Sequence, residues 1–407
     1  MIIDDELFNT VKDRLNEENE VDDDIALAII SEATFDYYEK EDKAKGYEEI
    51  VLCIKDIFYK TRSKLNILKP LIDDDAVTEI MVNSYKDIFY EKNNSVYRYN
   101  LTFDSNRDVE EVMHLIAGET NREINEMSPI VDARLLDGSR VNGVYKNVAV
   151  TGPTLTIRKF LNDYITMEQL VKNNTINQAG ADLLKILVEC GYNIFISGGT
   201  SSGKTTLINA LSEFIPKDQR VIVIEDSAEL KLNSVDNYVQ MECRNSNVLG
   251  KGEVTLSTLI KNSLRMRPDR IIVGEVRGEE VFHMLQAMNT GHSGMCTGHG
   301  NSVKGMLKRL ETMYLMAATL DINAIRNQIA DAIDIMIQIE KVGKERRIVE
   351  ISELLECENG EYVINKLMEY SHEDGLKFTG KGIMNRTKIL EVGEEYLNGL
   401  QENGVVI

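Results

Sequence analysis

The spacing of apolar residues changes along this chain, and the change predicts where its domains begin and end. Near the N-terminus the spacing is helical, because Ile50, Ile54 and Phe58 fall on one face with polar residues between them. Beyond Pro70, short runs with a period of two predict strands. We therefore expect an α-helical extension over residues 1–69, followed by a smaller α/β domain over residues 70–160.

Three arginines belong to predicted strands of this α/β domain. An Asp-Gly turn at residues 137–139 predicts a hairpin whose two strands carry Arg134 and Arg140. In the run that follows, over residues 154–160, apolar and polar residues alternate. Arg158 should therefore be presented on the polar face of a strand rather than buried.

A polar linker is expected over residues 161–177, and helical and strand patterns then alternate along residues 178–345. The strands expected there include Asn193–Ser197, Val221–Ile224 and Arg270–Val273. This alternation is typical of an α/β fold in which helices cover a sheet. Residues 346–407 are expected to add C-terminal strands and a helix.

A phosphate-binding motif joins the first of these strands to the helix that follows it. Residues 198–205 fit the pattern GxxxxGK[ST], in which backbone N–H groups and the positive end of a helix face a phosphate. Lys204 would add a cation, and the Thr205 hydroxyl would ligate Mg²⁺. The alternative is a glycine-rich turn without a ligand. The residues predicted to bind a nucleoside triphosphate are Gly198, Gly199, Thr200, Ser201, Ser202, Gly203, Lys204, Thr205 and Thr206.

Carboxylates follow the second strand, at the edge where α/β sheets bind ligands. Glu225 and Glu229 come at the end of the run Val221–Ile224, so both are candidates to bind Mg²⁺ or to orient a water molecule. The alternative is that these acids only cap the next element.

The third strand ends in another acidic candidate, Glu275, which we expect to polarise the attacking water. Arg277 lies two residues on, so it would project to the same side and hold Glu275 by a charge-assisted hydrogen bond. Gly274 stands where many P-loop enzymes have a Mg²⁺-binding aspartate, so metal contacts should come from Thr205 and Glu229. An ordinary ion pair at a strand end is the alternative for Glu275 and Arg277.

Two histidines, His292 and His299, stand seven residues apart in a stretch with four glycines. The glycines disfavour a helix, so a loop and a short strand fit better. We expect the histidines to have a hydrogen-bonding or sensing role near the nucleotide. A zinc site is the alternative, but no third ligand with plausible spacing accompanies them.

Composition and charge narrow the function further. The formal net charge of −21 over 407 residues disfavours sequence-independent binding to nucleic acid. The five cysteines never form a C-x-x-C pair, which favours reduced thiols. The sequence has no run of about twenty apolar residues and starts with acidic residues, which predicts a cytoplasmic protein.

Four segments in order resemble the Walker A, Asp box, Walker B and His box of the type II/type IV secretion ATPases. They are Gly198–Thr205, Ile224–Leu230, Leu264–Gly278 and Thr290–Ser302. Upstream, residues 132–142 and 152–160 resemble the N-terminal domain of the CpaF/TadA-type branch of that family. Other branches often carry a paired C-x-x-C zinc insertion, which this sequence lacks.

The resemblance implies a homohexameric ring with ATP and Mg²⁺ as cofactors. In such a ring a PAS-like N-terminal domain moves over a RecA-like ATPase domain and drives an inner-membrane platform protein in pilus assembly or secretion. The protein would be peripheral to the inner face of the membrane.

The resemblance also assigns roles by position. Glu275 corresponds to the catalytic Walker B glutamate, Glu229 to the Asp-box acid, and His292 and His299 to the His-box pair. Three further residues resemble arginines that the family directs toward the nucleotide phosphates, and which of them has that role stays open: Arg134, Arg140 and Arg158. A DNA translocase on the same RecA-like core and a nucleotide-binding scaffold ring without turnover are the alternative functions.

Overall fold

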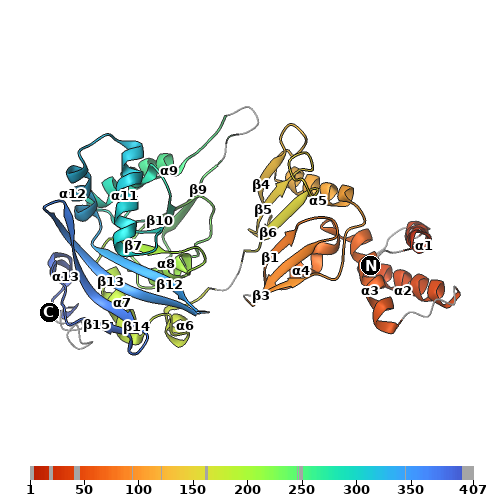
Figure 1. The fold of residues 1–407 in the computed structure, drawn as a ribbon, viewed down its shortest axis with the longest axis horizontal. Helices are drawn as coiled ribbons and strands as arrows, with labels where there is room; N and C mark the ends of the chain where they lie inside the picture. Colours follow the sequence, from red (N-terminus) through yellow and green to blue (C-terminus); the bar gives the residue numbers. More distant parts are fainter. Residues whose placement is uncertain are drawn as a thin grey trace. The chain divides into compact units, whose positions relative to one another are not determined.

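The computed structural model describes residues 4–17, 22–40, 46–93, 95–120, 122–160, 164–244, 246, 251–343 and 345–396. The chain forms two compact units, residues 1–162 and 163–407 (Figure 1). Of the expected linker, residues 161–163 lie outside the described residues. Within the described ranges, every helix is too short or too polar to cross a lipid bilayer.

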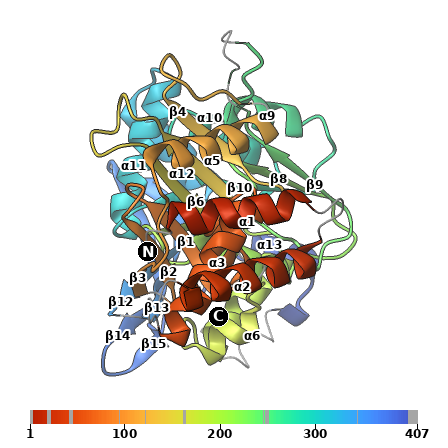
Figure 2. The same cartoon turned by 90° about the vertical axis from the view of Figure 1, so that its right-hand side faces the viewer.

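The first unit begins with three helices (Figure 2), and their apolar side chains form one cluster. They are α1 (Asp5–Glu17), α2 (Asp23–Lys40) and α3 (Tyr47–Arg62). Ile54 is buried in the cluster, and Ile50 and Phe58 pack against it, as their spacing predicts. Pro70 does not end the helical segment, because it lies in the first turn of another short helix, α4 (Lys69–Asp73).

A six-stranded antiparallel sheet follows, with the strand order β3-β2-β1-β6-β5-β4. Its strands are β1 (Val77–Val82), β2 (Ile88–Lys92), β3 (Ser95–Arg98), β4 (Ile130–Arg134), β5 (Arg140–Val144) and β6 (Thr154–Arg158). Helix α5 (Asn106–Glu119) packs its apolar side against this sheet through Val109, Met113 and Ile116. The predicted hairpin is the β4–β5 pair.

The second unit is built on a nine-stranded sheet with the order β15-β14-β13-β12-β7-β11-β10-β8-β9. The strands from β12 to β9 in this order run parallel, and β13 to β15 are antiparallel additions. Their bounds are β7 (Ile194–Gly198), β8 (Val221–Glu225), β9 (Tyr238–Glu242), β10 (Arg270–Val276), β11 (Ser293–His299), β12 (Ile335–Val342), β13 (Glu345–Glu358), β14 (Glu361–Ser371) and β15 (Gly375–Phe378).

Helices cover both faces of this sheet, which confirms the expected α/β fold (Figure 1). One face carries α6 (Met167–Lys172), α7 (Gln178–Glu189), α8 (Lys204–Ser212) and the C-terminal α13 (Thr387–Val392). The other carries α9 (Leu256–Ser263), α10 (Glu280–Asn289), α11 (Val303–Ala317) and α12 (Ile322–Ala332). Strand β7 therefore lies in the middle of the sheet, between β12 and β11, with its carboxyl end at a shared edge.

Candidate nucleotide site

The loop between β7 and α8, residues 199–203, is shaped by its glycines and is called the P-loop below. A Cβ at Gly198 would lie 2.4 Å from the carbonyl oxygen of Ile339 on β12, so only glycine fits where β7 ends. Gly203 adopts a φ of 101° directly before the first residue of α8. These two positions turn the chain so that α8 starts at the edge of the sheet, with its N-terminal N–H groups directed toward the loop.

Lys204, the first residue of α8, is folded into this loop. Its Nζ donates hydrogen bonds to the carbonyl oxygens of Gly198, at 3.1 Å, and Gly199, at 3.0 Å. The residue is only 7% exposed. Burial lowers the pKa of its ammonium group below the ordinary value, although the nearby Glu275 carboxylate opposes that shift.

Glu275 lies at the end of β10 between two partners. Arg277 Nη2 donates a hydrogen bond to Glu275 Oε2 at 3.1 Å, which confirms the predicted pairing of these two side chains. On the other side, His299 Nε2 approaches Glu275 Oε1 to 2.8 Å. Oε1 has no well-aligned hydrogen bond among the described residues, so this approach is a close contact that leaves a lone pair of Oε1 free.

His299 connects Glu275 to the P-loop lysine. Its Nδ1 lies 3.2 Å from Lys204 Nζ. Because an ammonium group only donates, Nδ1 must carry the lone pair, and the ring proton is then on Nε2, toward Glu275. Burial, followed by the charge of Lys204, lowers the pKa of His299 below its ordinary value. The imidazole is therefore neutral near neutral pH and links the two catalytic candidates.

Several buried polar atoms around the P-loop have no hydrogen-bond partner within the described part of the chain. They are Ser197 Oγ, Ser202 Oγ, Glu275 Oε1 and Gln338 Oε1. Buried polar atoms are normally hydrogen-bonded, so this concentration indicates a site that accepts a polar ligand or ordered water. Together with the helix N-terminus and Lys204, it fits the phosphates of a nucleotide.

The first turn of α8 offers oxygen donors for a metal ion. Thr205 and Thr206 are both half-buried there, while Thr200 and Ser201 are exposed on the P-loop. Glu229, also half-buried, follows β8. Hydroxyl and carboxylate oxygens are the ligand types that Mg²⁺ prefers, so Thr205 and Glu229 suit that ion by chemistry.

Glu225 does not fit the metal-binding role expected for it, because its carboxylate is turned inward. It is 3% exposed. Its Oε1 accepts hydrogen bonds from the backbone N–H groups of Glu229, at 2.8 Å, and Leu230, at 3.0 Å, and its Oε2 accepts one from Gln240 Nε2 at 2.8 Å. Burial raises the pKa of Glu225, and these hydrogen bonds oppose the rise.

The two histidines do not lie together. His299 ends β11 at the P-loop edge, whereas His292 precedes the first residue of that strand, where its Nδ1 lies 3.3 Å from Thr290 Oγ1. A seven-residue strand separates them by roughly 20 Å at about 3.3 Å per residue. The structure therefore places His292 outside the cluster around Lys204. The described residues also contain no group of three His, Cys, Asp or Glu able to hold a metal ion.

The three arginines of the first unit form one row across its sheet. Arg134 on β4 is the register partner of Arg140 on β5, and Arg140 is the partner of Arg158 on β6. Directly opposed residues in antiparallel strands project to the same face, so the three arginines stand side by side, and Glu79 on β1 continues the row as the partner of Arg158. Arg158 is exposed, as predicted. Arg134 Nε donates to the carbonyl oxygen of Gly138, which orients its guanidinium at the hairpin turn.

One residue that contacts the P-loop was not expected from the sequence. Arg346, near the start of β13, donates from Nε to the carbonyl oxygen of Ser201 at 3.0 Å. Its sequence surroundings are a charged run that is typical of an exposed hairpin, so no local signal indicated the contact. It arises because β12 and β13 form an antiparallel pair next to β7.

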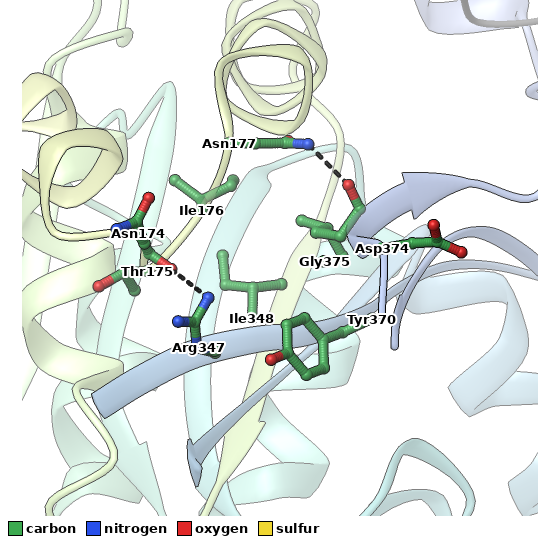
Figure 3. A pocket seen from close by; sticks show the side chains of 10 residues that line it. Asn174, Thr175, Ile176, Asn177, Arg347, Ile348, Tyr370, Asp374 and Gly375 are labelled. Carbon is green, nitrogen blue, oxygen red and sulfur yellow. Dashed lines mark hydrogen bonds between the residues drawn. The ribbon is translucent and has the colours of Figure 1, made fainter. Parts of the chain in front are cut away.

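The pocket shown in Figure 3 is separate from these motifs. It lies between the α6–α7 connection, β13 and the β14–β15 turn. Its polar groups bond to one another: Arg347 Nη1 donates to the carbonyl oxygen of Asn174 at 3.3 Å, and Asn177 Nδ2 donates to that of Leu376 at 2.6 Å. None of its lining residues belongs to the motifs predicted from the sequence.

Solved structures support the fold. The chain resembles the X-ray structure of the ATPase DotB from Legionella pneumophila, with a TM-score of 0.51 and 18% identity over 72% of this chain and 82% of that one. It also resembles the crystal structure of the pilus retraction motor PilT with bound ADP, with a TM-score of 0.52 and 18% identity over 84% of this chain and 94% of that one. These similarities show a fold shared with RecA-like ATPases.

Proteins similar to this chain in sequence indicate its family. An uncharacterized protein of Methanocaldococcus jannaschii is 42% identical over 58% of this chain, which spans only 34% of that relative. The conjugal transfer protein TrbB of Rhizobium radiobacter is 32% identical over 72% of this chain and 88% of its own length. The type IV secretion system protein PtlH of Bordetella pertussis is 31% identical over 70% of this chain and 93% of its own length.

A family model described as "Type II/IV secretion system protein" matches residues 61–393, which include every motif described above. The narrower resemblance to the CpaF/TadA-type branch stays a prediction. The chain belongs to the type II/type IV secretion system ATPase family.

Proposed function

We propose that this protein hydrolyses ATP with Mg²⁺ and works as a motor of a pilus or secretion machine. The arrangement that supports this best is the chain of contacts from Lys204 through His299 to Glu275, with Arg277 on the far side of Glu275. Activation of water for attack on a phosphate requires a carboxylate acceptor near a group that binds phosphate, and Glu275 and Lys204 are suited to these two roles.

Each group of residues has a different role in the proposed hydrolysis of ATP. The P-loop amides and Lys204 bind the phosphates. Thr205 and Glu229 would hold Mg²⁺, which when bound neutralises phosphate charge and orients the phosphates. Glu275 uses the free lone pair of Oε1 to accept a hydrogen bond, and then the proton, from the attacking water. Arg277 fixes Glu275 from the Oε2 side.

The arginine row supports a second element of the proposal. Arg134, Arg140 and Arg158 share one face of the sheet, in a row that continues to Glu79 on β1, the register partner of Arg158. Arginine side chains grouped on one face are suited to contact an anionic ligand. A nucleotide phosphate supplies that charge, and an arginine arriving at the phosphates stabilises the transition state. We propose that Arg134, Arg140 and Arg158 contribute this positive charge, so that movement of the first unit is coupled to hydrolysis.

We further propose that six copies form a ring and that a membrane-embedded platform protein is the partner. The family assignment and the names of TrbB and PtlH support a machine that moves material across a membrane. The net charge of −21 favours a protein partner over nucleic acid.

Phosphate release from ATP by the purified chain tests the proposal. We expect release that requires Mg²⁺, is unchanged by added DNA at low salt, and accompanies a hexamer in native mass spectrometry. ATP binding without phosphate release would support a scaffold ring instead, and stimulation by DNA would support a translocase.

A further inference from the structure

A buried carboxylate lies directly beneath the turn that carries Glu229. Glu225 ends β8, and its Oε1 accepts the backbone N–H groups of both Glu229 and Leu230. Gln240 on β9 secures the same turn, because its Nε2 donates both to Glu225 Oε2, at 2.8 Å, and to the carbonyl oxygen of Leu230, at 2.9 Å. The backbone of Glu229 is therefore held by a closed set of hydrogen bonds centred on Glu225.

The neighbouring strand leaves room for this carboxylate. Gly274 on β10 lies next to β8, and a Cβ at Gly274 would come within 2.9 Å of Glu225 Cγ. Any other residue at 274 would push the Glu225 side chain out of place. Position 274, where many P-loop enzymes have an aspartate, is therefore a glycine in this chain because the buried Glu225 side chain occupies the adjacent space.

We propose that Glu225 is a positioning residue for the reaction: it fixes the backbone of Glu229 so that the Glu229 carboxylate is held in place for Mg²⁺, and Gly274 is required for this. The inference rests on the proposed ATPase function. Glu225 itself touches neither nucleotide nor metal, since both of its oxygens are already bonded within the protein. Residues behind a metal ligand commonly affect metal affinity and activity about 10- to 100-fold.

A matched control exists elsewhere in the same unit. Glu353 on β13 is 1% exposed and has the same kinds of partners: it accepts the backbone N–H groups of Met384 and Asn385 and the Nδ2 of Asn365. These contacts lie outside the motifs of the nucleotide site. The two backbone N–H groups bond to different oxygens of Glu353 but to the same oxygen of Glu225, so Glu353→Gln turns an NH₂ group toward one of them. It should therefore disturb stability at least as much as Glu225→Gln, without a direct effect on the nucleotide site.

The test compares Glu225→Gln with Glu353→Gln in the full chain. It measures kcat for ATP, thermal stability, and binding of a fluorescent ATP analogue with and without Mg²⁺. For Glu225→Gln we expect kcat to fall at least about tenfold and the Mg²⁺-dependent gain in analogue affinity to be lost, with Mg²⁺-free binding unchanged. For Glu353→Gln we expect both kcat and the Mg²⁺ effect to stay within about twofold of the wild type, since it has no link to a metal ligand.

A double-mutant cycle tests the part played by Gly274. Gly274→Ala alone should reproduce the kcat and Mg²⁺ defects of Glu225→Gln, because the new methyl group displaces the carboxylate. Adding Gly274→Ala to Glu225→Ala should cause no further loss, since the group it collides with is gone. If Glu225→Gln proves too unstable to measure, Gly274→Ala alone still tests the role of Glu225, because it displaces the carboxylate without removing any of its atoms.

The outcomes separate the two proposals. A wild-type chain that releases no phosphate overturns the proposed function, and the role of Glu225 with it. A wild-type chain that is active, combined with a Glu225→Gln variant that behaves like Glu353→Gln, overturns the role of Glu225 alone. Full additivity of Gly274→Ala and Glu225→Ala likewise contradicts the coupling between the two positions.

Discussion

Arg277→Ala tests how the catalytic candidate Glu275 is held. Arg277 touches the carboxylate through one charge-assisted hydrogen bond of 3.1 Å. Such bonds contribute about 1.5–3 kcal/mol when shielded from water. The Arg277 side chain is 60% exposed and Glu275 is 21% exposed, so solvent screening reduces the contribution. We therefore estimate that this hydrogen bond contributes about 1 kcal/mol to stabilisation of the transition state. Its loss corresponds to roughly a fivefold lower kcat.

The assay is steady-state phosphate release over a range of ATP concentrations. KM for ATP should stay within about twofold of the wild type, since Arg277 acts on Glu275 and not on the phosphate-binding loop. Arg98→Ala is the control, because Arg98 is as exposed as Arg277, at 61%, and pairs with a carboxylate in the first unit, Asp87, which is 46% exposed. An Arg277→Ala variant with wild-type kcat, or one whose only defect is a raised KM, would refute the role given to this arginine.

Three further changes follow from the same site. Lys204→Ala should lower affinity for a fluorescent ATP analogue and abolish phosphate release, and an active variant would show that the loop is not the nucleotide site. The folded-state pKa of His299 is below its ordinary value of 6.5, so the unfolded chain binds more protons in the window just below pH 6.5. Unfolding free energy should therefore rise with pH through that window, and His299→Asn should flatten the rise in denaturant titrations; an unchanged slope would contradict the lowered pKa. Arg134, Arg140 and Arg158 should each be replaced with Ala. For whichever residue reaches the phosphates, we expect kcat to fall by roughly 10³-fold or more while binding of the ATP analogue is unchanged. If all three variants are fully active, none of these arginines takes part in catalysis.

The strand, loop and helix around the P-loop could be predicted because local signals agree there. The apolar run before Gly198, the motif spacing and the helical pattern after Lys204 all indicate the same structure. The pairing of Glu275 with Arg277 could also be predicted, because residues two apart in an extended segment lie on the same side, although Arg277 proves to be the first residue after β10. Both depend only on nearby sequence.

Contacts between distant strands could not be predicted in this way. Sequence placed Glu225 at the carboxyl end of a strand, but only the adjacent β9 and β10 reveal that Gln240 and Gly274 turn its carboxylate inward. The spacing of His292 and His299 gave no distance until the segment proved to be one extended strand. Arg346 reaches the P-loop through strand pairing alone. In each case the missing information was which strands are neighbours in the sheet.

The most direct test of the central claim is nucleotide turnover by Glu275→Gln. This variant keeps the size of the side chain and the P-loop but removes the carboxylate that accepts the proton. We expect it to bind ATP in the presence of Mg²⁺ as tightly as the wild type and to release phosphate at least about 100-fold more slowly, the lower end of the range for loss of a general base. Phosphate release at the wild-type rate would contradict the assignment of Glu275 and the site built around it.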